Sequence, residues 1–201
     1  MSRSAAFKPV DRREEILDAA QRCFARAGFH QTSMQEICAE ARMSPGGLYR
    51  YFASKEAIIA GIAERDRADV AEQFQMMREA PEFFQGLEAA ARHYFVDRPL
   101  DEVVLCAEIM SESRRSAEVD RIHTAIEADV QKGLVELLQN AAATGAIDKT
   151  IDFQATASIL MAIADGFAWR RAADKSFNAE AALPIAMKMI RAILTDKESA
   201  Q

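Results

Sequence analysis

The sequence has few residues that interrupt helices and no pattern that favours strands. Its 201 residues include only eight glycines and five prolines, and no stretch alternates apolar and polar residues over the length of a strand. Long segments are instead rich in Ala, Glu, Leu, Met and Arg, which favour helix. The composition therefore predicts an all-α protein of one or two domains with about nine helices.

Long apolar runs and cysteine pairs are also missing. No run approaches the roughly 18 apolar residues that cross a membrane, and residues 1–9 lack the apolar core of a signal peptide. The three cysteines, Cys23, Cys38 and Cys106, are odd in number and lack metal-ligand spacing, which fits reduced thiols. We expect a cytoplasmic protein that contacts no membrane, with Cys23 and Cys38 in the core.

Catalytic motifs are absent as well. Only three histidines are present, and the sequence contains no Gly-x-Ser-x-Gly, His-Glu-x-x-His or phosphate-binding glycine loop. The rival hypothesis, an enzyme in which His93, Cys106 and His123 converge, has no support from spacing. We therefore expect no enzymatic activity, no cofactor and no metal site.

What the sequence does contain is a pair of helix-start signals in residues 32–56. Ser33 and Glu36 form a capping box, in which a hydroxyl and a carboxylate satisfy free amide donors. Ser44 followed by Pro45 is a second start, an N-cap hydroxyl before a proline at the first helical position. This stretch is predicted to form two short helices joined by a tight turn.

The second of these helices has one apolar side and one side that suits DNA. Leu48 and Phe52 are expected to pack in a core and so to hold this helix in place. The remaining side offers phenol donors, a cation and bare backbone, which suit phosphates and base edges in a DNA major groove. An ordinary helical hairpin with surface tyrosines is the alternative. The residues on this side are Gly46, Gly47, Tyr49, Arg50 and Tyr51.

At these residues the chain resembles the tetracycline-repressor (TetR) family of one-component transcriptional regulators. The matching residues are 16–20, 23–29, 32–33, 47–52 and 54–56, about the first quarter of the chain. Arg42 stands where a glycine is usual, and arginine in a left-handed conformation costs about 1 kcal/mol. The resemblance implies a helix-turn-helix DNA-binding domain over 1–56 and a helical effector-binding and dimerisation domain over 57–201.

The residues and the resemblance together predict a DNA-binding set. The resemblance implies that Tyr49 and Lys55 contact the DNA backbone, and that Gln35 and the first residues of the reading helix approach bases. The complete predicted set is Thr32, Ser33, Gln35, Arg42, Ser44, Pro45, Gly46, Gly47, Tyr49, Arg50, Tyr51 and Lys55.

Charge is divided between the two predicted domains. Residues 1–56 hold nine Lys or Arg and seven Asp or Glu, a net of +2, so the rest of a chain whose total is −6 holds −8. An acidic body helps to aim the basic end at DNA. Arg3, Lys8, Arg12 and Arg13 are expected to form an arm that touches DNA, or else a solvated tail. A non-specific architectural DNA binder would need stronger basic character.

Periodicity and breakers predict the helices that follow Pro81. They are expected at about 82–97, 100–113, 117–143, 152–173 and 179–195, and Pro184 should make the last one kink or start later. The helices at 152–173 and 179–195 each have two apolar flanks, so we expect them to pair with their copies in a homodimer.

The resemblance implies a small-molecule pocket among the middle helices. We expect a largely apolar effector and a site that includes Phe95, Met110, His123, Met161, Asp165 and Trp169. His93, Glu108, Glu112 and Arg170 are further candidates to point inward, but each of these polar groups taken singly is expected to serve core packing or a surface ion pair instead. The predicted function is a repressor that binds a palindromic operator as a homodimer and is released by its effector. An activator or a corepressor-dependent regulator of the same fold is the alternative.

Overall fold

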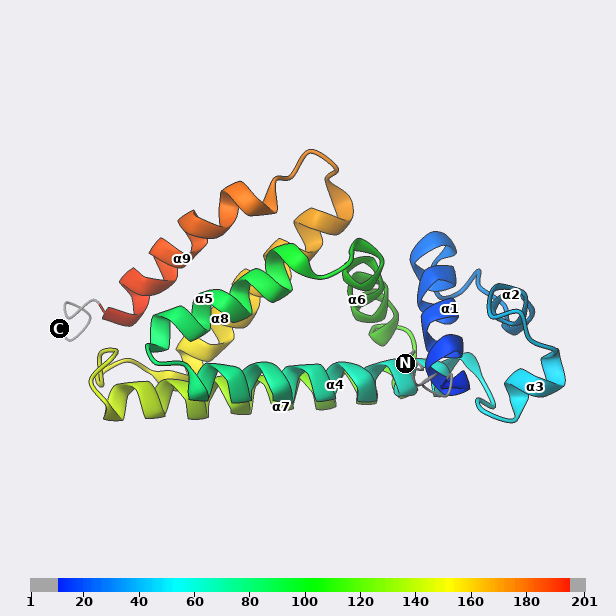
Figure 1. Ribbon diagram of the computed structural model, residues 1–201, viewed down its shortest axis with the longest axis horizontal. Coiled ribbons are helices and arrows are strands. Elements are labelled where there is room, and N and C mark those ends of the chain that lie inside the picture. The colour runs from blue at the N-terminus through cyan, green and yellow to red at the C-terminus, as the bar shows by residue number, and fades with distance from the viewer. Residues whose placement is uncertain (1–10, 196–201) are drawn as a thin grey trace, which may run out of the picture.

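The computed structural model describes residues 11–195, which form helices and their connections without a strand (Figure 1). This confirms the all-α prediction. The first three helices form a head at one end of the molecule, and the remaining helices form a longer body (Figure 1). The helices are α1 (Arg12–Ala27), α2 (Met34–Glu40), α3 (Pro45–Tyr49), α4 (Lys55–Glu79), α5 (Phe83–Arg92), the π-helical turn η1 (His93–Asp97), α6 (Leu100–Ser113), α7 (Ala117–Ala143), α8 (Phe153–Ala173) and α9 (Ala179–Thr195).

Local capping signals set the starts of the head helices. The capping box of Ser33 and Glu36 at the start of α2 is formed in full. The hydroxyls of Ser44 and Ser54 accept from the amides of Gly47 and Ala57, which begins α3 and α4. These starts were predicted because each depends on residues within one helical turn.

The head has an aromatic and aliphatic core that extends into the body. Phe24 and Phe29 lie with ring centroids 5.5 Å apart, and Ile37, Leu48 and Phe52 complete the cluster that the sequence predicted. Side chains from the body join the same cluster, namely Leu105, Ile109 and Val119. The expected boundary after residue 56 therefore falls in the first turn of α4, and α6 and α7 help to close the core of the head.

The body is organised along two long neighbouring helices. α4 and α7 lie side by side over much of the length of the molecule, and α6 stands between α1 and the rest of the body (Figure 1). A second core joins α4, α5, α7, α8 and α9. α9 spans Ala179–Thr195, as periodicity predicted, and includes Pro184, so of the two alternatives at this proline the later start is excluded. Within residues 11–195 no helix has the length and apolarity required to span a membrane.

Candidate nucleic-acid interface

α3 has one buried face and one exposed face. Leu48 is fully buried and Phe52 is 5% exposed, so both side chains hold the helix against the core. Tyr49 and Tyr51 are 54% and 46% exposed on the other side. A short helix pinned in this way presents its outer side chains at a fixed angle, which is the requirement for reading a DNA groove.

The two glycines of α3 differ in their surroundings. A Cβ at Gly46 would meet nothing within 4 Å, so packing inside the protein does not require glycine there. A Cβ at Gly47 would lie 3.2 Å from the Ser44 hydroxyl that caps the helix. Gly46 therefore leaves open, uncovered backbone at the start of α3, where a phosphate is able to approach closely.

The turn between α2 and α3 contains Arg42 in a left-handed conformation. Its φ is 52°, and it is the only non-glycine residue with positive φ in the described part of the chain. Arg42 and Arg50 are both exposed, and neither forms an ion pair with a residue between 11 and 195. Both cations are therefore available to DNA phosphates.

The other arginines of the head are engaged by carboxylates. Arg22 and Arg26 pair with Glu40 at 2.9 and 3.6 Å. Arg12 pairs with Glu15 at 2.5 Å, and Arg13 pairs with Glu64 at 2.6 Å. Arg12 and Arg13 belong to α1, because Asp11 caps that helix, so they are not part of an N-terminal arm as expected. Arg3 and Lys8 lie outside the described residues.

Besides Ser33 and Ser44, which cap α2 and α3, two residues of the predicted DNA-binding set have structural roles in the free protein. Thr32 is 2% exposed, and its hydroxyl donates to the carbonyls of Gly28 and Cys23 at 2.9 and 3.2 Å. The Lys55 ammonium donates to the carbonyl of Phe29 at 2.7 Å and lies 4.5 Å from the centre of that ring. Both side chains hold the turn between α1 and α2. Ser33, Gln35, Ser44 and Pro45 are exposed around the turn and α3.

Two carboxylates of α6, Glu108 and Glu112, contact the same turn, in agreement with the expectation that each one singly serves packing or an ion pair. The amide of Phe29 donates to Glu108 at 3.4 Å. The imidazole Nε2 of His30 lies 2.7 Å from Oε2 of Glu112, whose side chain is 4% exposed, so the two groups are within ion-pair distance although the angles do not make a hydrogen bond. The His30 contact was not predicted, because His30 and Glu112 are far apart along the chain. α6 thus links the body directly to the head.

The predicted effector residues are only partly brought together. Phe95 stacks on Phe167 with ring centroids 4.4 Å apart. Asp165 is exposed on α8, and partial desolvation by its neighbours raises its pKa while His123 on α7 opposes that shift. Met161 is half-buried on α8. Met110 and Trp169 are 41% and 62% exposed, so in a single chain they do not line an interior site.

An ion-pair cluster inside the body was not predicted. Arg98, at the start of α6, pairs with Asp66 of α4 at 3.0 Å and with Glu102 at 2.9 Å. Burial raises the pKa of Asp66, an effect that Arg98 opposes. Arg171 of α8 donates to the carbonyl of Arg98 at 2.8 Å. The cluster joins three helices around the N-terminal end of α6, whose other end contacts the head.

A helix-turn-helix head in which α3 has an exposed face, joined by one long helix to a helical body, is the architecture of a DNA-binding transcriptional regulator. Family models agree over both parts. Residues 16–62 match the model described as bacterial regulatory proteins of the tetR family, and residues 85–195 match the C-terminal model of BetI-type transcriptional repressors. The chain belongs to the TetR family, whose members are transcriptional regulators and not enzymes.

Individual relatives support the same assignment. The transcriptional regulator UidR of Escherichia coli K12 is 28% identical over 165 residues, which cover 77% of this chain and 78% of UidR. The transcriptional repressor AcnR of Corynebacterium efficiens is 35% identical over 72 residues, 36% of this chain and 38% of AcnR. The solved structure of Salmonella enterica GusR is 30% identical, with a TM-score of 0.81 over 95% of this chain and 99% of GusR.

Proposed function

We propose that this chain is a repressor that binds a palindromic operator as a homodimer and is released by a small-molecule effector. The observation that best supports operator binding is the outer face of α3. Tyr49 and Tyr51 are exposed there, and Arg42 and Arg50 have no carboxylate partner in the described part of the chain. Repression is supported by the similarity to the transcriptional repressor AcnR and by the match to the C-terminal model of BetI-type repressors.

Exposed apolar side chains on α8 and α9 support the proposed homodimer. Ile159 and Trp169 on α8 are 51% and 62% exposed, and Ile185, Met189 and Ile193 on α9 are 64%, 56% and 38% exposed. A patch of this kind on a regulator favours burial against a second copy. Ala155, Ser158 and Ala162 are exposed on α8, and a Cβ at Gly166 would meet nothing, so another helix has room to approach closely.

The proposed dimer accounts for sequence recognition by so short a helix. One reading helix covers few bases, whereas two related by a two-fold axis and held about 34 Å apart read both halves of a palindrome.

The proposed effector acts in the body, where Asp165, His123 and the stacked Phe95 and Phe167 come from η1, α7 and α8. Contacts between α6 and the head offer a route from that region to α3.

The test is a gel-shift titration with a labelled DNA fragment from upstream of the protein's own gene. The wild type should form a discrete complex that survives excess random DNA. A Tyr49→Ala, Arg50→Ala double variant should lose it, whereas Lys132→Ala, which removes a 77%-exposed cation from α7, should keep it. Binding that is equal for random DNA and for all three proteins would contradict sequence reading by α3. Activation in a reporter assay would contradict repression.

A further inference from the structure

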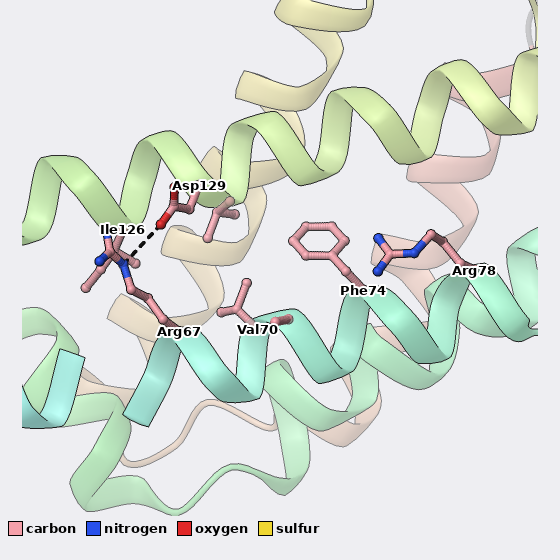
Figure 2. A pocket seen from close by; sticks show the side chains of 8 residues that line it. Arg67, Val70, Phe74, Arg78, Ile126 and Asp129 are labelled. Carbon is pink, nitrogen blue, oxygen red and sulfur yellow. Dashed lines mark ion pairs between the residues drawn. The ribbon is translucent and has the colours of Figure 1, made fainter. Parts of the chain in front are cut away.

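A continuous groove runs between α4 and α7 on the body. Two hollows of about 270 and 350 Å³ share Arg67 and Ile126, so they form one groove, here called the α4–α7 groove. Small side chains leave the space: Ala60, Ala63 and Ala71 on α4 and Ala125 on α7 line it. The hollow that extends from Arg67 to Arg78 is shown in Figure 2.

The floor of that hollow is apolar. Val70, Phe74 and Ile126 line it, and the Phe74 ring stands between the two helices (Figure 2). The ring fits there because residue 133 of α7 is glycine, where a Cβ would lie only 2.5 Å from a ring carbon. Phe74 is only 8% exposed and closes the base of the hollow, so the accessible apolar surface, a strip along the hollow, comes mainly from the half-buried Val70 and Ile126, which suit an alkyl or aryl chain.

The two ends of the strip are cationic but differ in their partners. Arg67 pairs with Asp129 of α7 at 3.0 Å, and the two side chains are 45% and 58% exposed. Arg78 donates to the amide oxygen of Gln75 at 3.0 Å and has no carboxylate within ion-pair distance in residues 11–195. The hollow has two arginines and one aspartate, so its net charge is positive. An anion binds most favourably at Arg78, because this arginine has no carboxylate partner.

The length of the strip limits the ligand further. Arg67 and Arg78 are eleven positions apart on one helix, which corresponds to about 16 Å along the axis. A carboxylate at Arg78 thus leaves room for an extended chain of about ten carbons before the Arg67–Asp129 pair. A short anion would leave the apolar floor exposed to water, and a cation would be repelled by Arg78.

We propose that the α4–α7 groove binds an amphipathic carboxylate, with its head on Arg78 and its tail along Val70 and Phe74. This site is separate from the residues expected to bind the effector. The Arg67–Asp129 pair is the only ion pair between α4 and α7 in the described residues, and α4 continues into the core of the head through Ile58 and Ile59. A tail that pushes between the two helices shifts the head, a consequence that rests on the proposed operator binding.

Calorimetry on the full-length protein with three simple probes tests the site. Sodium decanoate should bind saturably. Butyrate, which keeps the carboxylate but loses the apolar contacts of the tail, and decyltrimethylammonium, which loses the charge-assisted contact with Arg78, should each bind at least about tenfold more weakly. All probes are kept below their micelle concentrations. Arg78→Gln should weaken decanoate about tenfold, and Ala71→Leu, which fills the groove, should do the same. Lys188→Gln on α9 is the matched control and should have no effect.

Three results would overturn the site: no decanoate binding, equal binding of decanoate and decyltrimethylammonium, or unchanged decanoate affinity in both Arg78→Gln and Ala71→Leu. If Ala71→Leu does not fold, Arg78→Gln alone decides, because Arg78 is exposed. Operator binding is measured on the same preparations. Loss of the operator complex without loss of decanoate binding would contradict the proposed function and leave the groove site standing.

Discussion

The imidazole Nε2 of His30, in the turn after α1, lies 2.7 Å from the carboxylate Oε2 of Glu112 on α6. His30 is 62% exposed at its side chain and Glu112 only 4%, so the contact covers a nearly buried carboxylate from the outside. Arg115 lies 3.5 Å from the same oxygen. Together with the Glu108 contact to Phe29, this pair fixes the head on the body.

Removal of His30 should therefore destabilise the protein. His30→Ala leaves the Glu112 carboxylate with Arg115 alone, and we expect the free energy of unfolding in urea to fall by about 1 to 3 kcal/mol. Glu112→Gln in the same chain should recover part of that loss, because the buried charge is then gone. His123→Ala is the control, since its nitrogen lies 4.0 Å from Glu127. Strictly additive effects of the two substitutions would contradict direct coupling.

Arg42→Gly should change stability and DNA affinity in opposite directions. Glycine relieves a left-handed arginine with φ of 52°, so the free energy of unfolding should rise by about 1 kcal/mol. The same change removes a cation that we propose contacts a phosphate, so operator affinity should fall and the slope of log K against log salt should drop by about 1. Unchanged salt dependence would show that Arg42 does not contact the DNA backbone.

A charge on α9 should break the proposed dimer. Met189 is 56% exposed on α9, and Met189→Asp places a carboxylate in the proposed interface, where burial without a partner is costly. Analytical ultracentrifugation should show monomers at concentrations where the wild type is dimeric. Met76, on α4, is 48% exposed, and Met76→Asp should remain dimeric. If both variants stay dimeric, α9 is not the interface.

The Glu36 carboxylate should make α2 sensitive to acid. Its hydrogen bond from the Ser33 amide holds its pKa below the usual 4.5. Because the folded state has the lower pKa, the stabilisation is present above pH 4.5 and is lost as the pH falls through the folded-state pKa. Urea unfolding from pH 7 to pH 3 should show a smaller stability loss below pH 4.5 for Glu36→Gln than for the wild type. Glu72→Gln, at an exposed position on α4, should behave like the wild type.

Interactions within one helical turn were predictable from the sequence, and those between distant segments were not. The caps at Ser33, Ser44 and Ser54 depend on neighbouring residues. Thr32 and Lys55 instead point to carbonyls that the turn after α1 creates. Family resemblance indicates residue types on a DNA-facing surface but not which of them also hold the head together.

The same distinction explains the body. Helix spans after Pro81 follow from periodicity and breakers, and the structure confirms α6 at Leu100–Ser113 and α7 at Ala117–Ala143. The Arg98 cluster joins residues of α4 and α6 that no local pattern relates. The exposure of Trp169 likewise depends on how α8 packs, so the expectation that it faces inward had no local basis.

Hydroxyl-radical footprinting of the operator complex tests recognition by paired α3 helices most directly, because it reports both the reading helix and the dimer. Paired α3 helices should give two protected patches about 34 Å apart on one face of the duplex, both absent with the Tyr49→Ala, Arg50→Ala variant and both present with Lys132→Ala. A single protected patch, protection without a fixed position, or protection that persists in the double variant would contradict recognition by paired α3 helices.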